Sequence, residues 1–371
     1  GLAKIYPIYQ GILRHPWRSP TYARAKLRVV TRDWLLVETL GEEPVVVGQG
    51  RQMKNFVPIT VFLRRNPNLA AIQTAITETI TSGTGLASIT PKTNRVIRTE
   101  PVQMSDGRIH AVHVWCGPVD GEPPERPIPG PLKWDITLGE GSATPEYFIN
   151  AGMDPATEAS TERTFAEDVP SRSLNRDEAK TLSMTIDAAP ERTYCATWDF
   201  PDKQGAFRRV GWCARTLMES DEDGTEHLVC RAMNLLESVS DSPVPPSAFA
   251  DRILSGMAQP GVYRAVADIN TWTLLKWLDE PCPYFNWRSA QMHPADRDHL
   301  TEQMTEELEH GTTSAVLRLP GHTDGEWVPL HVSINRMELE SGVYAGLVTL
   351  RLPTEDELTH AGLEPPEESR T

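Results

Sequence analysis

The 371-residue chain lacks any apolar run that approaches the ~20 residues of a membrane-spanning helix. Its first residues also lack the apolar core of a secretory signal. Only five cysteines are present, and none of them forms a Cys-x-x-Cys pair. Sparse cysteines give no zinc signature and are typical of small buried side chains in a reducing compartment. These absences predict a cytoplasmic protein without a membrane span.

Sequence motifs for catalysis and for cofactor binding are missing as well. The chain has no Gly-x-Ser-x-Gly, no phosphate-binding P-loop and no His-Glu-x-x-His. The acidic run Asp221–Gly224 lacks the ligand spacing of an EF-hand and predicts a plain hairpin turn. We therefore expect no catalytic activity, no identifiable cofactor and no metal. An enzyme with an unrecognised active site remains the alternative.

Charge is divided unevenly along the chain. The net charge is −15, yet residues 1–32 carry seven Lys or Arg and no Asp or Glu. An acidic body repels nucleic acid and anionic membranes, so nucleic acid is not an expected partner. Residues 1–32 have no regular apolar pattern and are expected to form a poorly ordered basic arm. A DNA-associated regulator that uses this arm is a second alternative.

Proline-rich and acidic stretches divide the remaining chain. Residues 119–131 and 239–247 have the composition of linkers, and residues 354–371 that of a disordered acidic tail. Each block between them has the size of a small domain. The three expected domains cover residues 33–118, 132–238 and 248–353.

The third block has the clearest pattern of strands and helices. Leu300, Met304 and Leu308 recur every four residues and predict an amphipathic helix between Pro294 and Gly311. Alternating apolar and polar residues predict two strands before this helix and three after it. The predicted strands cover residues 262–268, 272–278, 312–319, 326–339 and 343–352.

The first and middle blocks repeat this order of elements. A helix is predicted between Pro67 and Gly83 in the first block, and a helical stretch with Leu182 and Ile186 in the middle block. Three strand-like segments follow in each case. The predicted fold is therefore α+β, with three tandem domains that each have a twisted antiparallel sheet, helices on one face and a cavity between them.

The last predicted strand, residues 343–352, is apolar on both faces. Its outer face therefore needs a cover, which a neighbouring domain, a second chain or the block's own helices would supply. In the middle block, Trp198, Phe207, Trp212 and Arg215 lie on predicted strands. Core packing or contact with a neighbouring domain is expected for these four side chains.

The run from residue 293 to 352 resembles PAS domains. Those domains open an acidic helix with His-Pro-x-Asp and end it with Gly, and an Asp-Gly turn precedes a strand that contains Trp. The matching residues here are His293, Pro294, Asp296, Gly311, Arg318, Asp324, Gly325 and Trp327. The middle block is less similar to PAS domains and resembles either these or the related GAF domains. The whole chain resembles the actinobacterial triple sensor-domain proteins with a PAS–GAF–PAS order.

This resemblance implies a non-catalytic sensor or signalling protein that binds a small molecule, acts through a protein partner, or does both. A ligand pocket is expected in the third block, where large aromatic residues cluster between the first two strands and the helix. Plain core packing of these residues is the alternative. The candidate ligand-binding residues are Tyr263, Trp272, Trp277, Tyr284, Phe285 and Trp287.

Overall fold

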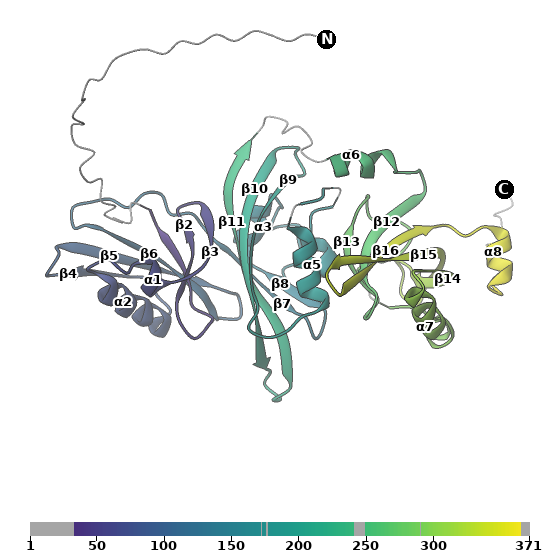
Figure 1. The fold of residues 1–371 in the computed structure, drawn as a ribbon, viewed down its shortest axis with the longest axis horizontal. Helices are drawn as coiled ribbons and strands as arrows, with labels where there is room; N and C mark the ends of the chain where they lie inside the picture. The colour runs from purple at the N-terminus through teal and green to yellow at the C-terminus, as the bar shows by residue number, and fades with distance from the viewer. Residues whose placement is uncertain (1–32, 172, 176, 241–248, 290, 365–371) are drawn as a thin grey trace, which may run out of the picture.

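The structure is a computed structural model that describes residues 33–171, 173–175, 177–240, 249–289 and 291–364. Three antiparallel sheets succeed one another along the chain, each with its own helices (Figure 1). Within the described residues, no helix combines the length and the apolar character that crossing a membrane requires. The sheets define an N-terminal, a middle and a C-terminal domain.

The N-terminal domain places two helices between its first strands and a three-strand meander. The helix α2 (Leu69–Ser82) buries Ile72 and Ile76. It ends at Gly83, whose left-handed conformation glycine adopts without strain. A third strand, β3, lacks an alternating pattern and was not predicted from the sequence. The other elements are β1 (Leu35–Glu38), β2 (Val45–Gln49), β3 (Gln52–Pro58), α1 (Ile59–Phe62), β4 (Leu86–Thr90), β5 (Arg95–Gln103) and β6 (Ile109–Pro118).

The middle domain has three short helices at the corresponding place. Its acidic run at Asp221 forms a plain hairpin turn, in which the Asp221 carboxylate accepts from the backbone N–H groups of Asp223 and Thr225. The elements are β7 (Gly130–Asp135), β8 (Glu140–Ala143), α3 (Pro145–Ala151), α4 (Phe165–Asp168), α5 (Glu178–Ile186), β9 (Thr193–Pro201), β10 (Phe207–Ser220) and β11 (Glu226–Ser240).

The C-terminal domain follows its predicted elements closely. The predicted helix starts at Pro294 as expected, and all five predicted strands form. The elements are α6 (Phe249–Gly256), β12 (Val262–Asp268), β13 (Thr273–Trp277), α7 (Pro294–Glu309), β14 (Thr312–Pro320), β15 (Trp327–Glu340), β16 (Val343–Arg351) and α8 (Glu355–His360).

The three sheets share one topology. Their strand orders are β3-β2-β1-β6-β5-β4, β8-β7-β11-β10-β9 and β13-β12-β16-β15-β14. Apart from the additional edge strand β3, each sheet therefore places its second strand next to its first, and its first next to its last. This common order confirms the prediction of three tandem α+β domains.

The expectation of a disordered tail from residue 354 onward was wrong for its first part. Helix α8 begins with a capping box between Thr354 and Glu357, and it buries Leu358. The Glu357 carboxylate also lies 2.6 Å from the Arg351 guanidinium at the end of β16. A reciprocal cap, an ion pair and one buried leucine order a segment whose acidic composition indicates disorder. Residues 365–371 lie outside the described residues.

The predicted linkers are shorter than the composition indicates. Strand β7 begins at Gly130, and β11 continues to Ser240. Between β6 and β7 the chain packs on both neighbouring domains: the Trp34 indole donates to the Pro124 carbonyl at 2.9 Å, and the Asn150 amide to the Ile128 carbonyl at 2.9 Å. Prolines therefore end the N-terminal sheet here without leaving the chain unpacked. Residues 241–248 lie outside the described residues.

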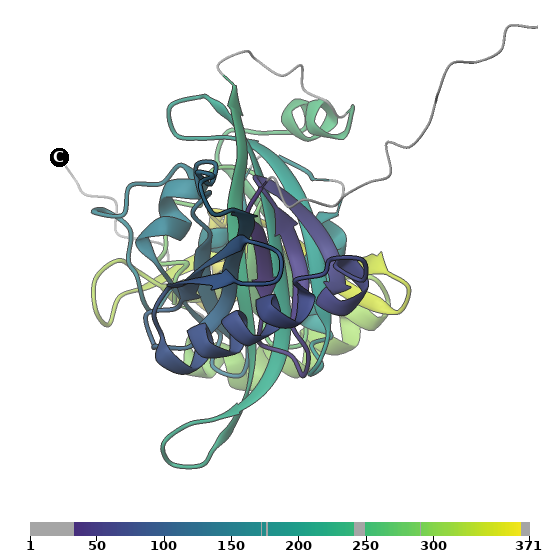
Figure 2. The same cartoon turned by 90° about the vertical axis from the view of Figure 1, so that its left-hand side faces the viewer.

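The N-terminal and middle domains pack sheet against sheet, and the middle domain packs on the C-terminal sheet through a helix. One face of the N-terminal sheet carries α2, and its other face packs directly against the back of the middle sheet, where Leu36 and Val47 contact Cys213 and Met233. Figure 2 views this stack from the N-terminal domain, with α2 across the front and the long β10–β11 hairpin extending beyond it.

Helix α5 of the middle domain covers the outer face of the C-terminal sheet. Its Leu182 and Ile186 pack with Val266 of β12 and with Ala345 and Leu347 of β16. The inner face of β16 packs with the domain's own core. A neighbouring domain therefore supplies the cover that the doubly apolar strand requires, as Figure 1 shows between the middle and C-terminal sheets.

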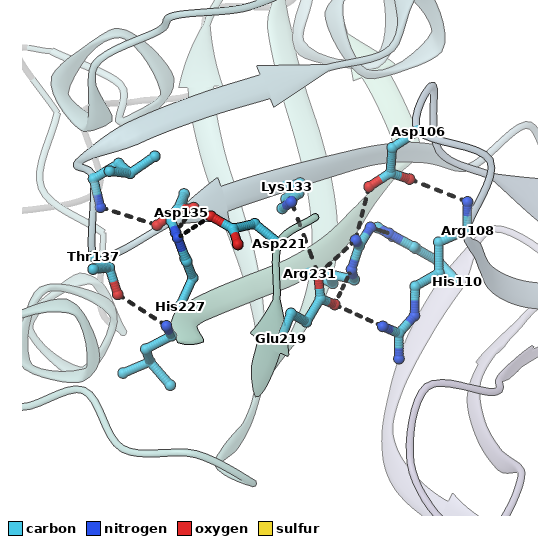
Figure 3. A network of polar contacts seen from close by, with 12 residues as sticks. Asp106, Arg108, His110, Lys133, Asp135, Thr137, Glu219, Asp221, His227 and Arg231 are labelled. Atoms are coloured by element: carbon cyan, nitrogen blue, oxygen red, sulfur yellow. Dashed lines mark hydrogen bonds and ion pairs between the residues drawn. The ribbon is translucent and has the colours of Figure 1, made fainter. Parts of the chain in front are cut away.

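A buried polar network joins the N-terminal and middle domains (Figure 3). The guanidinium of Arg231 on β11 donates to Asp106 at 2.7 Å and to Glu219 at 2.6 and 2.8 Å. His110 on β6 lies between the domains, with Nε2 3.1 Å from Arg231 Nη1 and Nδ1 3.1 Å from the Ala232 carbonyl. Arg231 can only donate, so His110 is neutral with its proton on Nδ1. Burial lowers the pKa of His110 to about 4.

A second ion pair crosses the same interface. Arg215 on β10 donates from Nε and Nη2 to both carboxylate oxygens of Glu38, at 2.6 and 3.1 Å. Its guanidinium also lies over the ring of Phe56. The contact with a neighbouring domain that the sequence predicts for Arg215 is thus confirmed. Two arginines from the middle sheet fix how the two sheets are aligned.

Acid should weaken the protein through His110. An unfolded chain protonates histidine below about pH 6.5, whereas the folded protein keeps His110 neutral to about pH 4. The unfolded state binds more protons between these values, so stability falls as the pH is lowered through them. By about pH 5 this residue alone costs on the order of 2 kcal/mol.

The measurement is urea unfolding at about pH 7.5 and about pH 5. His110→Gln keeps a donor and an acceptor but does not titrate, so its stability loss between the two values should be smaller by on the order of 2 kcal/mol. The matched control is His299→Gln on the exposed side of α7, which should behave as the wild type. Equal pH dependence in all three proteins would contradict the assignment.

Candidate functional site

A cavity of about 730 Å³ lies in the middle domain, between the inner face of its sheet and its helices. Its volume is within the ~300–1,000 Å³ range of sites for drug-sized ligands. The C-terminal domain supplies part of its wall. The cavity is the candidate functional site of the protein.

Tryptophans dominate the sheet side of the cavity. Alternate residues of β9 face the interior, which directs Trp198 and Phe200 inward. Trp212 of β10 meets Trp198 edge to face, with ring centroids 4.5 Å apart. Burial raises the pKa of the nearby Cys230 thiol to about 12, so this side chain stays protonated and apolar. These four side chains thus give the cavity an aromatic and uncharged floor.

Three helices form the opposite wall. Helix α3 carries Tyr147 and lies so close to β7 that a Cβ on Gly130 would be 2.3 Å from the Tyr147 Cα. Only glycine permits this approach. Helix α4 contributes Phe165 and Asp168, and α5 contributes Thr181 and Met184.

A fully buried arginine holds the charged part of this wall together. Arg163 donates to Asp168 Oδ1 from Nη2 at 2.8 Å and from Nε at 3.1 Å, and to the Ala159 carbonyl at 3.1 Å. Burial raises the pKa of Asp168, although Arg163 acts in the opposite direction. The carboxylate already has its cation, and it serves to position α4.

The third wall comes from the C-terminal domain. Leu275 and Trp277 of β13 line the cavity, together with Trp287 and Arg288 from the segment that precedes α7. Trp277 and Trp287 meet edge to face at 5.9 Å. Any molecule that fills the cavity therefore contacts two domains at once.

A buried ion pair fastens this wall to the middle domain. Lys276 of β13 lies 2.6 Å from the Glu178 carboxylate of α5, and its ammonium also donates to the carbonyls of Ser173, at 2.8 Å, and Pro170. Burial lowers the pKa of Lys276 and raises that of Glu178, while each charge supports the other. The pair sits where α5 passes from the cavity to the C-terminal sheet.

Only two of the six aromatic residues predicted as ligand-binding line this cavity. These are Trp277 and Trp287. The other four pack into the core of the C-terminal domain under α7, where the rings of Tyr263 and Tyr284 lie edge to face at 5.8 Å. The four residues of this core group are Tyr263, Trp272, Tyr284 and Phe285.

The motif residues that carry the PAS resemblance organise the start of α7. His293 caps the helix by accepting from the Ala295 N–H at 3.2 Å, and its ring lies 4.9 Å from that of Trp327. Pro294 occupies the first turn. The Asp296 carboxylate accepts from the Arg318 backbone N–H at 2.7 Å and from its guanidinium. Asp324 and Gly325 form the turn before β15, with Gly325 at a positive φ of 77°.

Sequence reasoning missed the floor of the cavity. Trp198 and Trp212 were expected in the core or in a domain contact, and they do pack within the middle domain's core cluster. The available signal was the alternation of aromatic residues along 194–200, which marks one crowded face. Alternation alone does not distinguish a filled core from one with room for a ligand.

In the part of the chain that the structure describes, no group of three or more His, Cys, Asp or Glu side chains is close enough to hold a metal ion.

Three family models match consecutive parts of the chain. They are the Rv3651-like N-terminal domain at residues 33–125, the Rv3651-like middle domain at 128–237 and the Rv3651-like C-terminal domain at 247–361. The crystal structure of an uncharacterised protein from Mycobacterium tuberculosis is 53% identical, with a TM-score of 0.81. That match covers 90% of this chain and 99% of the mycobacterial chain.

More distant solved structures include signalling proteins. A sensory box histidine kinase/response regulator from Burkholderia thailandensis is 14% identical over 29% of this chain and 76% of its own, with a TM-score of 0.21. An RNA-binding light-oxygen-voltage receptor is 10% identical over 63% of this chain and 98% of its own, with a TM-score of 0.23. Scores this low carry no argument. No curated protein matches the chain.

Breaking the Lys276–Glu178 pair should destabilise the junction beside the cavity. Lys276→Met leaves a carboxylate buried without its cation, which typically costs about 3–5 kcal/mol. The double variant Lys276→Met/Glu178→Leu removes both charges and should recover much of the lost melting temperature. Calorimetric melting of the wild type, Lys276→Met, Glu178→Leu and the double variant gives the coupling free energy between the two side chains. Additive losses would show that the two groups do not act as a pair.

Proposed function

The chain belongs to the Rv3651-like family, and we propose that it works as a non-catalytic signalling protein whose middle domain binds a small, mainly apolar molecule. The observation that carries this proposal is the 730 Å³ aromatic cavity with walls from two domains. Pockets of this size and lining bind apolar ligands and use a few polar groups for orientation.

A binding role fits the polar groups of the cavity better than catalysis does. The Cys230 thiol has its pKa raised to about 12 by burial, which removes the thiolate that a cysteine nucleophile needs. Asp168 is held by Arg163, and Glu167 by Arg288. Carboxylates that already bind a cation are poor general bases. Among the residues that the structure describes, no specific contact favours an enzyme over a binding protein.

Helix α5 would transmit occupancy of the cavity to the C-terminal domain. Thr181 and Met184 line the cavity, Leu182 packs on the outer face of the C-terminal sheet, and Ile186 does both. A ligand that favours one position of α5 therefore also favours one arrangement of the two domains. The signal would then reach a protein partner through the C-terminal domain.

The common topology of the three domains and the PAS resemblance of residues 293–352 support a sensory role. A cytoplasmic site of action is supported by the small number of cysteines and by the burial of most of them. The alternative of DNA binding depends on residues 1–32, which lie outside the described residues.

Filling the cavity should abolish ligand binding. Val210 lines the cavity from β10, so Val210→Trp places a bulky ring in the ligand space. Val239→Trp adds the same ring at an exposed site on β11 and is the matched control. At 100 times the dissociation constant, decan-1-ol should stabilise the wild type and the control by about 2.7 kcal/mol. Val210→Trp should melt cooperatively but show no such shift, and an equal shift in all three would place the ligand elsewhere.

Ligand binding should also be detectable outside the middle sheet. Hydrogen exchange of the amides in α5 and β13 should slow when decan-1-ol is added, because both elements wall the cavity. Helix α2 packs on the far face of the N-terminal sheet and serves as the internal control. Protection confined to β9–β11 would mean that the C-terminal domain does not sense the ligand.

A further inference from the structure

We propose that the cavity selects its ligand by charge: it accepts uncharged or cationic apolar molecules and rejects carboxylates and phosphates. This inference rests on the proposed function and adds the chemical class of the ligand. It follows from the ion pairs around the cavity.

Acidic side chains outnumber basic ones along the cavity wall. Six carboxylates and two cations line it. The acidic residues are Asp135, Glu158, Glu167, Asp168, Asp202 and Asp268, and the basic residues are Lys203 and Arg288. Arg163 and Arg208 pair with Asp168 and Asp202, and the acidic excess that remains makes the site less favourable for an anion than for a neutral or cationic molecule.

Both lining cations already face a carboxylate. The Lys203 ammonium lies 2.9 Å from the Glu158 carboxylate, and Arg288 Nε lies 2.8 Å from Glu167. A carboxylate that enters the cavity must therefore break one of these pairs or give up its hydration without a counter-charge. Burying an ion without a counter-charge is strongly unfavourable.

Asp268 is the carboxylate with the least compensated charge. Most of the others have a cationic partner, such as Arg163 for Asp168 and Arg208 for Asp202. Asp268 instead accepts from neutral donors, the Asn270 N–H at 2.8 Å and the Thr271 hydroxyl at 2.9 Å. Among the described residues, no cation lies within ion-pair distance of it.

The aromatic walls act in the same direction. The faces of tryptophan rings attract cations and tolerate neutral apolar groups. Trp198, Trp212, Trp277 and Trp287 all line the cavity, and Asp268 lies on the wall that also carries Trp277. A molecule with an apolar body and a cationic or neutral head would meet tryptophan rings and, at Asp268, a carboxylate without a cationic partner.

A matched series of ten-carbon probes tests this selectivity on the full-length protein. Decan-1-ol, decanoate and decyltrimethylammonium differ mainly in the charge of the head group. Calorimetric titration at about pH 7.5 should show binding of the alcohol and the cation, with decanoate at least about tenfold weaker than the cation. Equal or tighter binding of decanoate overturns the inference but leaves the proposed function intact. Failure of all three probes to bind overturns both.

Two variants test which residues make the cavity prefer a cationic probe to an anionic one. Asp268→Asn keeps the hydrogen-bonding shape and should weaken the cation severalfold without changing the alcohol. Glu167→Gln releases Arg288 and should strengthen decanoate severalfold. Glu309→Gln changes the net charge equally at an exposed position on α7 and should change none of the three. Equal effects of Asp268→Asn on all three probes would show that it shapes the wall and does not select charge.

The dependence on salt gives an independent measurement if a variant folds poorly. In the wild type, added NaCl should weaken the cation and leave the alcohol unchanged, because ions screen charge but not apolar burial. Equal salt dependence of the two probes would contradict selection by charge.

Discussion

The constraint on which this structure depends is that each sheet is apolar on both faces, whereas each domain's own helices cover only one. An uncovered apolar sheet face must be buried against something else. The N-terminal and middle sheets solve this by packing back to back, and the C-terminal sheet takes its cover from α5. The domains are therefore separate in topology but not independent in packing, and the order of the stack follows from which faces remain open.

This arrangement gives α5 two roles. One side of the helix walls the middle-domain cavity, and the other is the second face of the C-terminal core. The buried Lys276–Glu178 pair fixes the helix at that junction, and the Arg288–Glu167 pair spans the same seam nearer to solvent. A cavity built this way couples its contents to the contact between two domains. The buried Arg231 network and the Arg215–Glu38 pair hold the N-terminal sheet to the opposite side.

The candidate site was only partly predictable. Aromatic residues before α7 were expected to surround a pocket of the C-terminal domain, but Tyr263 and Tyr284 fill its core. Trp277 and Trp287 reach a cavity of the neighbouring domain instead. Composition identifies large apolar side chains, and both a core and a pocket need them. Only the packing of one domain on the next decides which side chains leave a space between them.

The sequence by itself determined the three repeated α+β units and most elements of the C-terminal domain. It also determined the start of α7 through His293, Pro294 and Asp296. These features depend on local periodicity, capping and turn chemistry, which act between residues close in the chain. The tertiary structure alone decided the pairing of Lys276 with Glu178 and the location of the cavity. Each of these depends on groups that are far apart in the sequence and meet only in the folded protein. A local sequence pattern does not reveal such contacts.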